Sequence, residues 1–174
     1  PETMPLTRTA NSAIDKVAHQ HAAVAAHLAE YGGSDLLCYR AEGPSELVAR
    51  QAEAWNKLLD WAAEVYGAPL LAVKGVIHHP QPVQSLQALG RVVAALDPFT
   101  LTGFHDLVGL SGSLILALAV LEGRLDPETA WNLSCIDEQW QQEQWGQDDL
   151  AVEAAVLKQV AFLAAARFVD LARA

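Results

Sequence analysis

The residues best suited to chemistry lie in the segment 126–157, which combines carboxylates with tryptophans. Eight Asp and Glu side chains fall in this segment and no Lys or Arg does, so it supplies most of the formal net charge of −10. The acids are Asp126, Glu128, Asp137, Glu138, Glu143, Asp148, Asp149 and Glu153, and the tryptophans are Trp131, Trp140 and Trp145. Acidic side chains mixed with large aromatic ones on a helix are typical of a docking surface for another protein.

An acid–base reaction would need two carboxylates that reach one substrate, and the pair Asp137 and Glu138 comes closest. Consecutive residues of a helix point about 100° apart, so these two side chains cannot readily act on one molecule. The sequence LSGS at 110–113 lies in an apolar helix and does not form a GxSxG nucleophile elbow. No phosphate-binding loop occurs. We therefore predict no catalytic residues and no bound nucleotide, so the protein is not expected to be an enzyme.

The histidines and cysteines lack the spacing of metal ligands. His78 and His79 are adjacent in an extended segment, and no pair among the first-helix histidines is separated by four residues. The two cysteines, Cys38 and Cys135, lie far apart and form no CxxC motif, which favours a reducing compartment. We predict neither a metal site nor a cofactor.

The acidic balance of the chain limits its partners. Binding to nucleic acid or to an anionic membrane surface needs clustered Lys and Arg, so we expect neither. The longest apolar run, 107–121, is shorter than the roughly 20 residues of a membrane span, and we expect no membrane insertion. A partner with a basic or mixed surface fits the charge, although acidity can also serve solubility alone.

Helical periodicity recurs along most of the chain and predicts one mainly α-helical domain over residues 1–174, with about six helices. The expected helices cover residues 14–31, 45–66, 83–96, 98–122, 127–145 and 148–172. Two short apolar stretches between turn residues, 35–40 and 70–73, are compatible with a small two-stranded β element. For the last helix, the periodicity predicts an inward face of Leu150, Leu157, Ala161, Ala164, Phe168 and Leu171.

The helix expected over 127–145 carries large side chains on two faces. One face holds Leu133, Ile136 and Trp140, and the opposite face holds Trp131, Cys135, Glu138, Gln142 and Trp145. A helix that is apolar on two sides is either enclosed in the core or offers one side to a partner. The functional reading is a partner-binding face, and the alternative is a helix packed on its neighbours with its acids in water.

Four stretches of the chain resemble one known family. They are AWNLSCIDEQWQQEQWGQDD at 130–149, PETMPLTRTANSAID at 1–15, RQAEAWNKLLDWAAEVYGAPL at 50–70 and DPFTLTGFHDLVGLSGSLILALAVLEGRL at 97–125. Their order and spacing resemble the ATP12-type assembly chaperones, which bind the α subunit of the F-type ATP synthase catalytic head. The resemblance covers almost the whole chain.

The resemblance implies a chaperone that holds the unassembled α subunit, shields it from aggregation and releases it when the β subunit takes over that surface. It points to Asp137 and Glu138 as the acidic position, with Trp140, Glu143 and Trp145 beside them, and Trp131 and Gln142 complete the expected partner-binding set. The resemblance implies a basic residue in many relatives where this chain has Cys135, so the charge pattern of the face is expected to differ there.

Family members also carry a small β-rich N-terminal domain, which this chain, opening at Pro1, does not contain. We therefore expect the chain to be the C-terminal part of a longer protein. Members occur in mitochondria and in α-proteobacteria, which implies the mitochondrial matrix or the bacterial cytoplasm, with the cytoplasm preferred.

Two other functions stay open at this point. The chain could be a helical module that forms a homo-oligomer through its Trp-rich helix. It could also bind a small molecule, or act on one, near His78 and His79 with a pocket beside Trp55 or Trp61.

Overall fold

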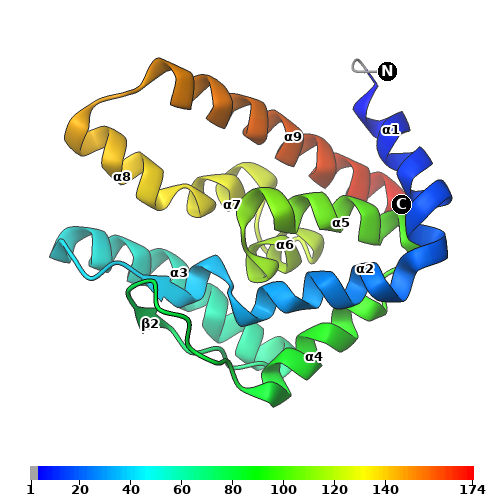
Figure 1. The fold of residues 1–174 in the computed structure, drawn as a ribbon, viewed down its shortest axis with the longest axis horizontal. Helices are drawn as coiled ribbons and strands as arrows, with labels where there is room; N and C mark the ends of the chain where they lie inside the picture. The colour runs from blue at the N-terminus through cyan, green and yellow to red at the C-terminus, as the bar shows by residue number, and fades with distance from the viewer. Residues whose placement is uncertain (1–3) are drawn as a thin grey trace.

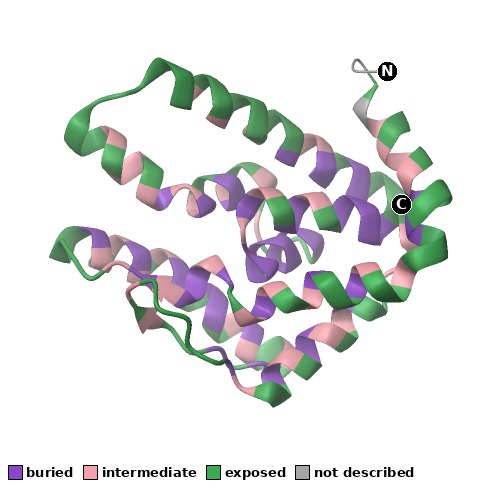
Figure 2. Cartoon of the chain, in the orientation of Figure 1, coloured by how far each residue is buried: buried purple, intermediate pink, exposed green. Residues whose placement is uncertain are grey.

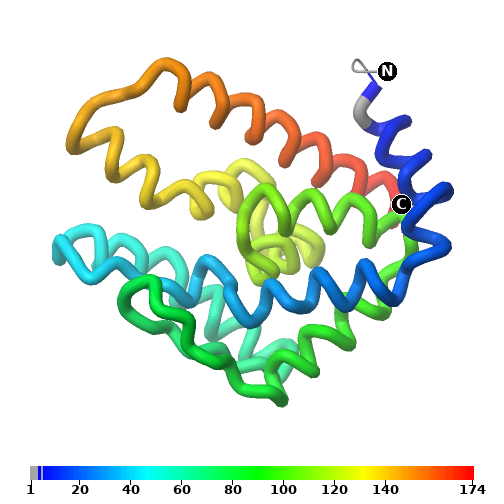
Figure 3. Tube along the Cα trace, in the orientation of Figure 1, coloured from blue at the N-terminus to red at the C-terminus, as the bar shows by residue number. Residues whose placement is uncertain are grey.

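The computed structural model describes residues 4–174, without the side chain of Pro5. Residues 1–3, which include Pro1 and begin the family-like stretch 1–15, lie outside the described residues. The first described helix and the C-terminus lie at one end of the molecule, and the turn between the last two helices lies at the other end (Figure 3).

Most of the described chain is helical, which confirms the prediction of a mainly α-helical fold (Figure 1). The α-helices are α1 (Pro5–Ser12), α2 (Ala18–Glu30), α3 (Ser45–Tyr66), α4 (Val83–Ala94), α5 (Pro98–Ser111), α6 (Leu114–Leu121), α7 (Pro127–Ser134), α8 (Ile136–Trp145) and α9 (Asp149–Arg173). Shorter turns are the π-helical η1 (Ala13–Val17) and the 3-10 turns η2 (Tyr31–Gly33) and η3 (Leu36–Cys38). Helices outnumber the six or so expected, because two expected helices are each divided and α1 precedes the first.

The core is built around α6, whose eight residues are all buried. Its sequence, LILALAVL, has no polar side chain, and a helix that is apolar all round must be covered on every side. Helices α3, α5, α7 and α9 and the turn η2 all contact it. Figure 2 shows this buried centre, with the exposed residues on the outer helices.

A single helix was expected over 98–122, and this expectation is wrong because the chain turns at Gly112 and Ser113. Gly112 has a φ of +69°, a left-handed conformation that glycine adopts without strain, and its N–H closes α5 on the carbonyl of Val108. The hydroxyl of Ser113 then accepts from the N–H of Leu116 and begins α6. The turn lets the apolar α6 enter the core while α5 stays at its side.

The start of α6 depends on a buried carboxylate, Asp35, from a distant part of the chain. Asp35 accepts hydrogen bonds from the N–H of Ile115 at 3.0 Å, the hydroxyl of Ser113 at 2.8 Å and the N–H of Leu37 at 3.0 Å. Burial raises the pKa of Asp35 from 3.8 to about 6, although these hydrogen bonds favour the charged form. One side chain therefore caps both η3 and the central helix.

The raised pKa of Asp35 predicts a specific pH dependence of stability. The Asp35 carboxyl group binds a proton more tightly in the folded state than in the unfolded chain. Its contribution to the unfolding free energy is therefore fully present below pH 3.8 and is lost as pH rises through about 6. Relative to Asp35→Asn, the unfolding free energy of the wild-type protein should fall by up to about 3 kcal/mol between pH 4 and pH 7. Urea unfolding at several pH values measures this difference.

The exposed Asp60 on α3 provides the control for this measurement. Asp60→Asn should leave the pH dependence of the wild-type protein unchanged. A constant difference in unfolding free energy between wild type and Asp35→Asn across this pH range would contradict the prediction.

The expected small two-stranded β element is present, with shorter strands than the stretches 35–40 and 70–73. Strand β1 (Tyr39–Arg40) pairs in parallel with β2 (Val73–Lys74). The expectation of a strand over 35–40 holds only for its last two residues, because Asp35 caps the N–H of Leu37 and turns residues 36–38 into η3.

A second expected helix, 127–145, is divided at Cys135, whose φ of −107° and ψ of 19° are not helical. Trp131 and Ile136 are both buried, yet five residues on one straight helix would point them about 140° apart. The break between α7 and α8 allows both side chains to reach the core. Trp131 therefore does not share a helical face with Glu138 and Trp145, contrary to the expectation.

The C-terminal half of α9 packs along α5 through Phe162, Ala165, Ala166 and Val169. The predicted inward face was wrong for Leu150, Leu157, Ala161 and Leu171, which are exposed, and Ala164 is half-buried, whereas Phe168 is buried as expected. The N-terminal half of α9 runs past the helices that cover its C-terminal half, so periodicity there does not mark a core face.

Helices α5 and α9 approach each other closely at Gly103. A Cβ atom at this position would lie 2.7 Å from Val169 Cγ2 and 3.0 Å from Phe168 Cδ1, so Gly103→Ala should lower the unfolding free energy by about 1–3 kcal/mol. The same substitution at the exposed Gly109, where a Cβ meets nothing within 4 Å, should raise it by about 0.5–1 kcal/mol. Urea unfolding of both variants tests the contrast, and equal effects would contradict it.

Candidate functional site

Six of the seven residues predicted to bind a partner lie on α8, on more than one side of the helix, and together they are called the α8 face: Asp137, Glu138, Trp140, Gln142, Glu143 and Trp145. The acids near the start of α8 suit the positive end of the helix. Within this set the side chains divide into a group that contacts α3 and a group that faces water. The division decides which of them a partner can reach.

Arg50 of α3 binds two residues of the α8 face. Its guanidinium donates two parallel hydrogen bonds to the Glu143 carboxylate, at 2.9 and 2.8 Å, and lies 5.0 Å from the centre of the Trp140 ring. The hydrogen bond from Arg50 lowers the pKa of Glu143. Both Trp140 and Glu143 thus make contacts within the chain.

Gln51, the next residue of α3, fixes the start of α8. Its amide nitrogen donates to Asp137 Oδ1 at 2.6 Å, and its amide oxygen accepts from the N–H of Ala41 at 2.8 Å. One turn further along α3, the indole of Trp55 donates to the carbonyl of Leu133 at 2.9 Å. Polar contacts from α3 therefore hold the region around the α7–α8 break.

The remaining predicted residues differ in their access to water. Glu138 and Trp145 are exposed, with 78% of Trp145 open to solvent, and Gln142 is half-buried. Trp131 is buried in the core, where its ring lies 5.6 Å from that of Phe162. A partner approaching α8 would meet Glu138 and Trp145 first.

Sequence reasoning missed Arg50 and Gln51 as partners of the α8 acids. They lie 93 and 86 residues from Glu143 and Asp137, and nothing in the local pattern links them. The one available signal was the position of Gln51 on the inner face of an amphipathic helix, because a polar side chain buried there needs a hydrogen-bond partner.

Loss of the Gln51 amide should weaken this part of the fold. Gln51→Leu leaves the N–H of Ala41 without its acceptor and Asp137 without its donor, so we expect the unfolding free energy to fall by about 1–3 kcal/mol. The matched control, Gln87→Leu at an exposed position of α4, should change it by less than about 0.5 kcal/mol. Equal stabilities of the two variants in urea unfolding would show that the Gln51 contacts carry no net stability.

The histidine region does not gather ligands. Among the described residues, no group of three or more His, Cys, Asp or Glu side chains is placed to hold a metal ion. His78 contacts the Tyr39 hydroxyl at 3.3 Å, and His79 contacts the carbonyl of Pro80 at 3.2 Å. Trp55, proposed as part of a pocket there, is completely buried.

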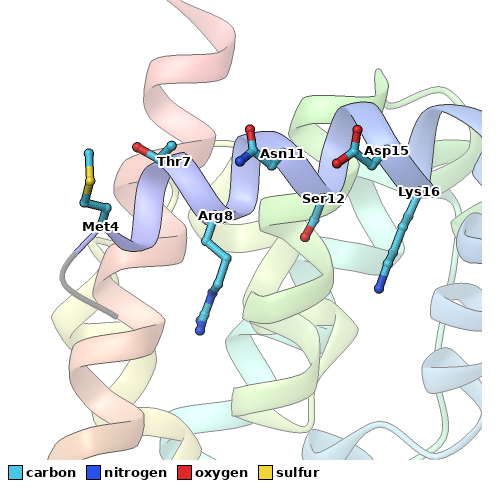
Figure 4. Close-up of a pocket in the computed structure, with 7 residues that line it drawn as sticks. All are labelled: Met4, Thr7, Arg8, Asn11, Ser12, Asp15 and Lys16. Carbon is cyan, nitrogen blue, oxygen red and sulfur yellow. The ribbon is translucent and has the colours of Figure 1, made fainter. Parts of the chain in front are cut away.

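A groove runs beside α1 and η1 and is lined by Met4, Thr7, Arg8, Asn11, Ser12, Asp15 and Lys16. In Figure 4, Arg8, Ser12 and Lys16 extend to one side of the helical ribbon, and Asn11 and Asp15 lie on the other. All lining residues come from one continuous stretch of chain. Among the described residues, only this stretch lines the groove, so the groove is open along its length.

Nowhere in residues 4–174 does a helix combine the length and the apolar character that crossing a bilayer requires.

Comparison with known proteins identifies relatives of this chain. A sequence profile described as ATP12 chaperone protein matches residues 1–63. The crystal structure of Atp12 from Paracoccus denitrificans is 54% identical, with a TM-score of 0.95 over 98% of this chain and 73% of that one. An Asp-to-Lys mutant of the same protein aligns equally well, with a TM-score of 0.96. A candidate chaperone from Agrobacterium tumefaciens is 42% identical, with a TM-score of 0.89 over 95% of this chain and 62% of that one.

Proposed function

This chain belongs to the ATP12 chaperone family, and we propose that its client is the unassembled α subunit of the F-type ATP synthase. In this proposal the chain covers an aggregation-prone surface of the α subunit and leaves when the β subunit occupies that surface. The observation that carries the proposal is the family likeness, which extends over nearly the whole chain. The likeness to proteins of two bacteria supports the bacterial cytoplasm as the place of action.

The proposed contact uses the α8 face in two ways. Glu138 and Trp145 are open to a partner, so the indole would supply contact area and the carboxylate would orient a basic client. Asp137, Trp140 and Glu143 would support the face from the side of α3, with Gln142 at its edge and Trp131 beneath it. Such a small, polar-rimmed contact favours release of the client.

No catalytic role is part of the proposal. The acid pair Asp137 and Glu138 is divided, because Asp137 binds Gln51 and Glu138 faces water. We likewise propose no role for a nucleotide, a metal or a nucleic acid in client binding.

Suppression of aggregation tests the proposed function. Isolated ATP synthase α subunit is diluted from denaturant or heated, with and without this chain, and light scattering is followed. Protection at near-stoichiometric ratios is expected, without protection of an unrelated aggregating protein. An α subunit that aggregates equally with and without the chain would contradict the proposal.

A charge reversal tests the α8 face within the same assay. Glu138→Lys should raise the chain concentration needed for half-protection at least about tenfold, because a basic client would meet a like charge. Glu64→Lys, at an exposed position of α3, changes the net charge equally and should protect like wild type. Circular dichroism verifies that both variants stay helical. Full protection by Glu138→Lys would remove Glu138 from the contact.

A further inference from the structure

The N-terminal half of α9 exposes a row of large apolar side chains. Leu150, Val156, Leu157 and Val160 are between 50% and 77% open to solvent. Figure 2 shows this half of α9, and the turn that joins it to α8, as mainly exposed. Trp145 lies at the end of α8, directly before this turn.

The exposed row lies opposite the buried side of the same helix. At 3.6 residues per turn, the four exposed residues fall within an arc of about 120°. Of the buried residues of α9, Phe162, Ala165, Ala166 and Val169 fall within an arc of about 100° on the other side, whereas Phe168 lies in line with Leu150. The exposed side is therefore buried at Phe168, in the C-terminal half of α9, but Leu150, Val156, Leu157 and Val160 stay uncovered by the described residues.

Carboxylates lie within the exposed arc. The helical positions of Asp149 and Glu153 place both acids between the apolar residues of this outer side. Lys158 does not lie on this outer side, because it is near Cys135. Burial raises the pKa of the Cys135 thiol, and the positive charge of Lys158 opposes this rise. The surface thus combines apolar area with negative charge.

We propose that this outer α9 face, defined as Leu150, Glu153, Val156, Leu157 and Val160, binds an apolar segment of the client bordered by Lys or Arg. The apolar side chains would supply the contact area, and Asp149 and Glu153 would pair with the basic residues. A second copy of this chain would offer the same outer face, which over residues 149–160 carries no Lys or Arg to pair with Asp149 and Glu153. The inference rests on the proposed function, and it locates the client on a surface separate from the α8 face.

The test compares two pairs of exposed apolar residues. Leu150→Gln/Leu157→Gln removes the outer α9 face while retaining good helix formers. Val76→Gln/Ile77→Gln makes the same polar change in the loop after β2, where the two side chains are 93% and 84% exposed. Affinity for purified α subunit is measured by titration, aggregation of the α subunit by light scattering, and helix content by circular dichroism.

We expect the α9 variant to bind the α subunit at least tenfold more weakly and the loop variant to bind within twofold of wild type. Asp149→Lys/Glu153→Lys should slow association and reduce its dependence on salt. Wild-type affinity in the α9 variant would overturn the inference while leaving the proposed function intact. A wild-type chain that does not bind the α subunit would overturn the proposed function itself.

Light scattering of the chain alone tests whether a second copy of this chain occupies the outer α9 face. A wild-type dimer that the α9 substitutions convert to a monomer would identify the outer α9 face as a contact between copies, and would overturn the inference. A monomer in both cases supports it.

Discussion

The fold depends on the burial of α6, a helix with no polar side chain to turn toward water. Its first N–H groups must find acceptors inside the core, and Asp35 and Ser113 provide them. This requirement brings residue 35 beside residue 113 and fixes η3 and β1 on the core. Strand β1 then positions Arg40 and Ala41 against α3, where Asn56 and Gln51 bind them. Gln51 also holds the start of α8, so the cap of the central helix is linked to the α8 face by a short series of contacts.

Sequence patterns located most helix ends because their signals are local. Asp97 and Asp126 each precede a proline and cap the helix that follows, and Gly67 ends α3 with a φ of +62°. The division of two expected helices was not predicted, since a glycine or serine in an apolar run can lie within a helix as well as end one. The carboxylate of Asp35, which is remote in sequence, accepts from Ser113 and Ile115 directly after the turn at Gly112.

The same limit applies to the candidate site. Acidic and aromatic residues identified α8, but only the fold assigns Glu143 to Arg50 and leaves Glu138 free. Part of the acidity of this segment therefore serves contacts within the chain. Helical periodicity identified the apolar residues of α9, but it did not predict which of them other helices cover. The cover depends on how far α5 extends beside α9. The family resemblance, and not any motif of chemistry, indicated the chaperone function.

The N-terminal half of α9 is exposed and its C-terminal half is packed, so the two halves differ in how readily they unfold. The packed C-terminal half provides the first turns on which the exposed half can extend, so the uncovered turns need no separate nucleation. Their amide hydrogens should open by fraying from Asp149 inward, without unfolding the core. A surface that is already helical before it meets another molecule loses little conformational entropy on contact. For the proposed contact of the outer α9 face with a client, this lowers the entropic cost of each encounter.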